Sequence, residues 1–133
     1  MSGPGSPIRL LLVDDEAGYL EVLEKRLSLR GLDVTLAPGG GEAIQTLRKQ
    51  DFDVAVVDLK MQDMDGIDLL KVLKKMVPKL AVIILTGHGS EQAARDGIAQ
   101  GAFDYLTKPC ELDKLLERIK AAFVSSLESA AGG

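Results

Sequence analysis

The sequence VAVVD at Val54–Asp58 places four apolar residues in succession before an aspartate. A run that is apolar at every position predicts a strand with both faces covered, as in parallel sheets that lie between layers of helices. AVIILT at Ala81–Thr86 has the same character. These two runs therefore predict an α/β fold with a parallel sheet.

Three further apolar or β-branched runs accompany these two, and a segment with helical spacing of apolar residues follows each of the five. The predicted strands are Arg9–Val13, 33–36, Val54–Asp58, Ala81–Thr86 and Asp104–Thr107. The predicted helices are 20–29, 42–49, 67–76, 90–100 and 112–127. Gly97, inside the fourth helix, should cost about 1 kcal/mol relative to alanine and weaken that helix.

Length and composition limit the classes of protein to consider. The chain has 133 residues, 46% hydrophobic and 27% charged, which is typical of one globular domain. We expect that domain at 8–124, after a flexible lead-in or cloning scar at 1–7 and before a flexible tail or linker start at 125–133.

A net charge of −4 argues against direct nucleic-acid binding. A single cysteine and no apolar run of about 18 residues predict a cytoplasmic chain without a membrane span.

Charged or hydroxyl side chains end or directly follow four of the five predicted strands. They are Asp14, Asp15 and Glu16 after the first strand, Asp58 at the end of the third, Thr86 at the end of the fourth and Lys108 after the fifth. Because ligands of open α/β sheets bind beyond the carboxyl ends of the strands, we expect these groups to converge. An aspartate after a strand also caps helices, and this alternative stays open for Asp14 or Asp15 taken singly.

Clustered carboxylates repel one another unless a cation lies between them, and an all-oxygen set suits Mg²⁺ better than Zn²⁺. A metal and a lysine can neutralise phosphoryl oxygens while a carboxylate attacks the phosphorus in line. We therefore expect Asp58 to be the nucleophile. Asp14 and Asp15 would hold the metal. Lys108 would pair with one phosphoryl oxygen, and Thr86 would donate a hydrogen bond to another.

From position 8 to about 123 the chain resembles the receiver domain of bacterial two-component response regulators, the family that includes the chemotaxis regulator. Four motifs carry the resemblance: VDDE at 13–16, VVDLKMQDMDG at 57–66, LTGHG at 85–89 and DYLTKP at 104–109. Each is moderately specific, and the four in order are highly specific. The resemblance implies a (βα)₅ flavodoxin-like three-layer sandwich with a five-stranded parallel sheet of order 2-1-3-4-5.

The resemblance also implies a role for each acidic residue. Asp58 would be the phosphoacceptor, taking a phosphoryl group from the phosphohistidine of a sensor histidine kinase or a phosphotransfer protein. Asp15, Asp58 and the backbone carbonyl of Lys60 would ligate Mg²⁺, or Mn²⁺ in its place. Asp14 would act on the metal largely through water.

The resemblance further implies how phosphorylation is transmitted. Thr86 and Tyr105 would be a switch pair, and the Lys108–Pro109 peptide bond would be cis. The surface of the fourth helix, fifth strand and fifth helix would change and regulate an output domain or partner protein. The same surface would serve a homodimer.

Two features depart from the family pattern or vary within it. Many receivers have proline where this chain has Gln62 after Met61, so we expect a more mobile loop. Lys60 and His88 occupy positions that border the phosphoryl group in the family, and we hypothesise that they tune the lifetime of the acyl phosphate. The alternative for His88 is an exposed loop residue without a role.

Three other functions compete with a signalling switch. A flavin-binding protein is disfavoured because the acidic DDEAG after the first strand would repel a flavin phosphate. A Mg²⁺-dependent aspartyl phosphohydrolase commonly has its nucleophile after the first strand and a second aspartate two residues on, unlike adjacent Asp14 and Asp15 with a distant Asp58. A docking module without phosphorylation would not need Thr86 and Lys108 beside the acidic set. We therefore expect no enzyme beyond self-phosphorylation and autodephosphorylation at Asp58.

Overall fold

The computed structural model describes residues 6–87 and 90–132, with side chains through Glu128. Within these residues, five strands alternate with five helices. The strands are β1 (Arg9–Val13), β2 (Asp33–Ala37), β3 (Val54–Asp58), β4 (Ala81–Thr86) and β5 (Asp104–Thr107). The helices are α1 (Ala17–Leu29), α2 (Gly40–Lys49), α3 (Gly66–Met76), α4 (Glu91–Ala99) and α5 (Leu112–Gly132).

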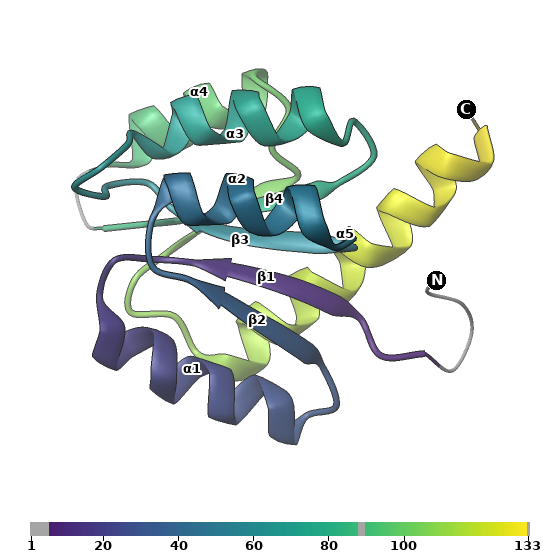
Figure 1. Cartoon of the computed structure of the whole chain (residues 1–133), viewed down its shortest axis with the longest axis horizontal. Coiled ribbons are helices and arrows are strands. Elements are labelled where there is room, and N and C mark those ends of the chain that lie inside the picture. The colour runs from purple at the N-terminus through teal and green to yellow at the C-terminus, as the bar shows by residue number, and fades with distance from the viewer. Residues whose placement is uncertain (1–5, 88–89, 133) are drawn as a thin grey trace.

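The sheet is parallel throughout, and its strand order is β2-β1-β3-β4-β5. Helices α2, α3 and α4 cover one face, while α1 and α5 cover the other (Figure 1). Every residue of β3 and β4 is buried. The predicted flavodoxin-like three-layer sandwich and its strand order are therefore confirmed.

The uninterrupted apolar runs are required because the sheet separates two apolar clusters. Along β1, Leu10 and Leu12 belong to the cluster under α1 and α5. The alternate residues Leu11 and Val13 belong to the cluster under α2 and α3. Successive side chains of a strand point to opposite faces, so a strand between two helix layers must be apolar at every position.

Helix α1 buries only part of its predicted apolar pattern. Leu20, Leu23 and Leu27 are buried at the spacing of a helical stripe. Val22 and Leu29 lie off that stripe and are 52% and 86% exposed. The prediction for this helix is therefore right in its existence and only partly right in its buried face.

Gly97 has a packing role that its effect on helix propensity does not show. The residue is buried in α4. A Cβ at this position would overlap the Cδ1 atoms of Ile84 and Ile67. The missing side chain lets α4 approach β4 and α3 closely, so tight packing offsets the cost of glycine in the helix.

The structure corrects the prediction for the C-terminal segment. Helix α5 continues to Gly132, five residues beyond the predicted end at 127, so residues 125–132 are helical where a flexible tail or linker start was expected. The residues LESAA at 127–131 are mostly good helix formers, and no proline interrupts them. Ser6 and Pro7, the described part of the lead-in, are exposed and outside any helix or strand. No described helix is both long enough and apolar enough to cross a membrane.

Candidate functional site

The sheet order brings three of the predicted groups together at the carboxyl edge. Val13 of β1 pairs with Val57 of β3, so Asp14 and Asp58 leave neighbouring strands at the same level. Lys108 follows β5, beyond β4, and its long side chain reaches back to both carboxylates. The carboxyl edge next to β3 is therefore a single site built from three separate segments of the chain.

The amine of Lys108 is shared among three carboxylates. Its Nζ donates to Asp14 Oδ2 at 2.7 Å. The same atom lies 3.5 Å from Glu16 Oε1 and 3.6 Å from Asp58 Oδ1. Burial alone would lower the pKa of Lys108, but the hydrogen bond and charge of Asp14, with the other two carboxylates, outweigh burial and raise it. The amine also lies 4.7 Å above the Tyr19 ring.

Asp58 ends β3 and is only 6% exposed. Burial and the neighbouring charge of Asp14 raise the pKa of Asp58, and the Lys108 charge and the Lys60 amide oppose that shift. A raised carboxyl pKa means that the nearby positive charge and hydrogen-bond donor do not fully offset the cost of burying the ionised carboxylate beside another negative charge. Additional positive charge at the site would therefore stabilise the ionised carboxylate.

The carboxylates form a group that fits a hard divalent cation. Asp14, Glu16 and Asp58 each offer one oxygen, and these atoms lie within 4.8 Å of one another. Oxygen donors without nitrogen or sulfur suit Mg²⁺ and Mn²⁺.

Glu16 was not predicted as a ligand, although its place directly after two aspartates was the available signal. Asp15 was predicted as a ligand and is not in this group. His88 lies outside the described residues.

The structure places Asp15 on the side of the loop that follows β3. Its Oδ2 accepts a hydrogen bond from the Gln62 amide at 2.9 Å. In the same loop, Lys60 is exposed and forms an isolated β-bridge with Asp65. The loop that carries Lys60 therefore supplies a hydrogen-bond donor to Asp15.

The proposed switch residues occupy neighbouring strands. Thr86 is fully buried, and its hydroxyl lies 3.4 Å from the carbonyl oxygen of Ser90. Tyr105 is half-buried, pairs with Ile84 and packs against the cluster beneath α2 and α3. The Lys108–Pro109 peptide bond is cis, the geometry that the resemblance implies. The arrangement leaves the threonine hydroxyl bonded within its own loop rather than to the carboxylates.

Hydrogen bonds anchor the loop between β3 and α3, where a more mobile loop was predicted from Gln62. The Asp63 carboxylate accepts the N–H groups of Gly40 and Gly41, each at 3.1 Å. It thereby caps α2, whose own N-cap residue makes no side-chain hydrogen bond. At the other end of the loop, Asp65 accepts the N–H of Ile67 at 2.7 Å and caps α3.

We expect Asp63→Ala to lower the free energy of unfolding by roughly 0.5–1 kcal/mol at neutral pH, a low capping value because the carboxylate is exposed. The N–H groups of Gly41 and Gly40 lower the pKa of Asp63 in the folded state. A lowered carboxyl pKa stabilises the fold above the unfolded value of about 3.9, and that stabilisation is lost as the pH falls. Urea unfolding should therefore show the two proteins converging in acid.

The exposed carboxylate of Glu21 on α1 offers a matched control for this experiment. Glu21→Gln should not show the loss at neutral pH that disappears in acid. A loss for Asp63→Ala that stayed constant across the pH range would contradict a charge-dependent cap.

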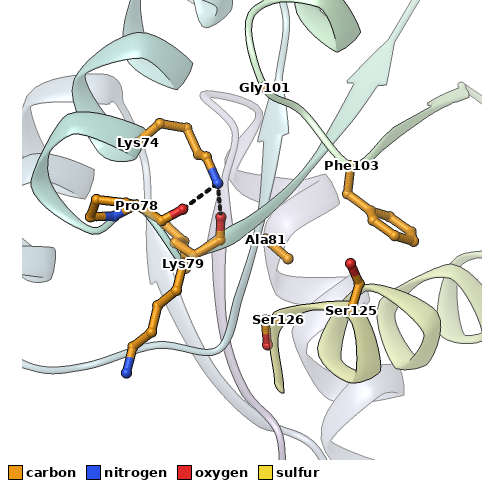
Figure 2. A pocket seen from close by; sticks show the side chains of 9 residues that line it. Lys74, Pro78, Lys79, Ala81, Gly101, Phe103, Ser125 and Ser126 are labelled. Atoms are coloured by element: carbon orange, nitrogen blue, oxygen red, sulfur yellow. Dashed lines mark hydrogen bonds between the residues drawn. The ribbon is translucent and has the colours of Figure 1, made fainter. Parts of the chain in front are cut away.

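A cavity of about 210 Å³ lies at the opposite edge of the sheet, between the start of β4 and Ser125 and Ser126 of α5. Figure 2 shows Lys74 at this place. Its amine donates to the carbonyl oxygens of Pro78 at 2.7 Å and Leu80 at 2.8 Å. Burial lowers the pKa of Lys74. These bonds close the connection from α3 to β4, so the lysine has a structural role and no contact with the carboxylate site.

The fold and the site together define a signal-receiver domain of the α/β class. The order of the strands, the buried aspartate that ends β3 and the lysine that follows β5 are its defining features. The chain belongs to the response regulator receiver domain family, whose model matches residues 10–120.

Individual relatives agree with this assignment. The chain is 41% identical over 120 residues to the transcriptional regulatory protein GlrR of Escherichia coli, and 35% identical over 124 residues to ZraR of Salmonella typhimurium. These alignments cover 90% and 93% of this chain but only 27% and 28% of the two relatives. The chain therefore corresponds to about a quarter of the length of these transcriptional regulators.

Solved structures show the same fold over nearly the whole chain. A receiver domain protein from Clostridium thermocellum has a TM-score of 0.84 at 35% identity, covering 87% of this chain and 94% of that chain. A CheY-like receiver domain protein from Methanospirillum hungatei has a TM-score of 0.88 at 31% identity, covering 93% and 99%. Both similarities extend across the sheet and its helices.

Proposed function

We propose that residues 8–124 act as the phosphoacceptor switch of a two-component phosphorelay. Asp58 takes a phosphoryl group from the phosphohistidine of a sensor histidine kinase or a phosphotransfer protein. The observation that carries the proposal is the buried Asp58 carboxylate with the Lys108 amine 3.6 Å away. The strand order puts this carboxylate beside the β1–β3 switch point, where open α/β sheets bind ligands.

The transfer needs few groups. An oxygen of Asp58 attacks the phosphorus, the phosphorus–nitrogen bond of the phosphohistidine breaks, and the electron pair remains on the imidazole nitrogen. Lys108 exchanges part of its contact with the carboxylates for a phosphoryl oxygen. Thr86 turns its hydroxyl from the Ser90 carbonyl toward another phosphoryl oxygen. Water later hydrolyses the acyl phosphate, so the only reactions are phosphorylation and dephosphorylation of Asp58 itself.

Asp15, Asp58 and the Lys60 carbonyl hold Mg²⁺ or Mn²⁺ in this proposal, and Asp14 acts on the ion through water. The proximity of Asp14, Glu16 and Asp58 supports a cation at this place. When bound, the ion supplies positive charge that offsets the carboxylates and the phosphoryl oxygens. Glu16 lies close enough to add to the negative potential of the pocket.

Movement of Thr86, with inward rotation of Tyr105, transmits phosphorylation to the surface of α4, β5 and α5. That surface then engages an output domain, a partner protein or a second copy of the receiver. The relatives are named as transcriptional regulators, so we propose a cytoplasmic regulator whose output is transcription. The kinase provides the input, and no direct contact of this domain with nucleic acid is needed.

Phosphorylation of Asp58 is tested by incubating the protein with acetyl phosphate and Mg²⁺ and measuring its intact mass. Wild type should gain the mass of one phosphoryl group. Asp58→Asn should gain none, because the asparagine amide is not a nucleophile under these conditions. Asp68→Asn, an exposed aspartate on α3, is the matched control and should behave as wild type.

Other outcomes of this experiment point to the other functions. No Asp58-dependent gain with either acetyl phosphate or a cognate kinase would contradict the proposal and favour a docking module. Turnover of small phosphate esters well beyond one equivalent would instead favour a phosphohydrolase.

A further inference from the structure

The backbone amide of Gln62 determines where the carboxylate of Asp15 lies. Its N–H donates to Asp15 Oδ2 at 2.9 Å across 47 residues of sequence. Both residues are exposed, so this hydrogen bond rather than burial positions the carboxylate. Asp15 is not among the carboxylates that lie within 4.8 Å of one another, which are those of Asp14, Glu16 and Asp58.

The grouped carboxylates and Asp15 differ in their contact with Lys108. The Lys108 amine lies within 3.6 Å of each of the three grouped carboxylates. Asp15 takes its donor from the loop after β3 instead. That loop is held in place next to Gln62, because Asp63 is bonded to the amides of Gly40 and Gly41. The Gln62 amide is therefore a fixed donor and not a freely moving one.

We infer that the Gln62 N–H is a latch that holds the Asp15 carboxylate apart from those of Asp14, Glu16 and Asp58 and thereby weakens the binding of divalent cations. The inference rests on the metal site of the proposed function. Asp15 lies apart from the other three carboxylates while its Oδ2 accepts the Gln62 N–H, and moving Asp15 toward them would lengthen or break this hydrogen bond. The hydrogen bond stabilises the arrangement in which Asp15 lies apart from the other three carboxylates. The apparent affinity for the cation falls as this arrangement becomes more populated.

The latch depends on a backbone group, which allows a sharp test. Proline is the one residue without an N–H, and alanine keeps the N–H while removing most of the glutamine side chain. Mg²⁺ binding to chelator-treated wild type, Gln62→Pro and Gln62→Ala is measured by isothermal titration calorimetry. We expect Gln62→Pro to lower the Kd by about 3- to 10-fold, as for loss of one hydrogen bond to a charged group. Gln62→Ala should stay within about twofold of wild type.

The results separate the latch from the metal site. Equal affinities for Gln62→Pro and Gln62→Ala, or weaker binding by Gln62→Pro, would overturn the latch and leave the metal site in place. If none of the three proteins bound Mg²⁺, the metal site would be wrong and the latch with it.

A second measurement needs no variant and holds even if Gln62→Pro does not fold. Amide–water exchange of the Gln62 N–H is followed by NMR in wild-type protein, first with chelator and then with saturating Mg²⁺. The latch predicts exchange that is several-fold faster with Mg²⁺, because the amide loses its acceptor. Exchange that is unchanged or slower with bound Mg²⁺ would overturn it.

Discussion

Replacing Gly66 with alanine should lower the free energy of unfolding by about 2–3 kcal/mol, the cost of forcing atoms into a packed region. A Cβ at Gly66 would lie 2.6 Å from the carbonyl oxygen of Asp58, 2.7 Å from Leu59 Cα and 2.8 Å from the Leu59 carbonyl oxygen. These are backbone atoms that cannot rotate away. The Gly66 N–H also donates to the Leu59 carbonyl at 2.8 Å, which keeps the two segments in contact.

The same substitution should slow phosphorylation of Asp58. Either the start of α3 or the end of β3 must move, and Asp58 is the last residue of β3. A small displacement of a reacting group costs roughly 10- to 100-fold in rate. The rate of mass gain with acetyl phosphate measures this effect on the folded fraction of the variant.

Gly18→Ala is the control for Gly66→Ala. Gly18 lies within α1, and a Cβ there would meet no heavy atom within 4 Å. Alanine at this helical position should stabilise the protein by about 0.5–1 kcal/mol. Urea unfolding should thus give opposite signs for the two substitutions. Equal effects would contradict the close contact of α3 with the end of β3.

Lys108→Met should lower the free energy of unfolding by about 2–4 kcal/mol in the presence of a chelator, because it leaves buried carboxylates without their cation. The Lys108 side chain is 18% exposed, and Asp14, its nearest partner, is almost completely buried. Methionine retains the length of the side chain and removes the charge, so the effect reports electrostatics more than packing. Thermal or urea unfolding measures the loss.

Two comparisons identify the cause of that loss. Lys114→Met, at an exposed position of α5, should have little effect. Adding Asp14→Asn to Lys108→Met should recover much of the stability, since neutralising one carboxylate removes part of the unpaired charge. Mg²⁺ should also stabilise Lys108→Met more than it stabilises wild type if the ion binds where we propose. A Lys108→Met protein as stable as Lys114→Met would contradict the shared-amine arrangement.

Much of the candidate site could be predicted because parallel strands end at one edge. Asp58 ends a strand that its apolar run marks clearly, Asp14 and Lys108 each follow one, and the topology then brings the three close. The sequence did not predict which of the neighbouring carboxylates lie together. Whether Glu16 or Asp15 joins the group depends on the direction in which the loop after β1 turns, and no residue pattern encodes that direction.

The sequence by itself determined the alternation of strands and helices, the parallel sheet and the residues at its carboxyl edge. It could do so because the pattern of apolar and polar side chains along one segment indicates burial on two faces or helical spacing. Only the tertiary structure decided that Asp63 caps α2, that the Ile84 side chain packs against Gly97 and that the Gln62 N–H donates to Asp15. These contacts join distant segments, and two of them use backbone N–H groups that nearly every residue carries. Their partners exist only once the chain has packed.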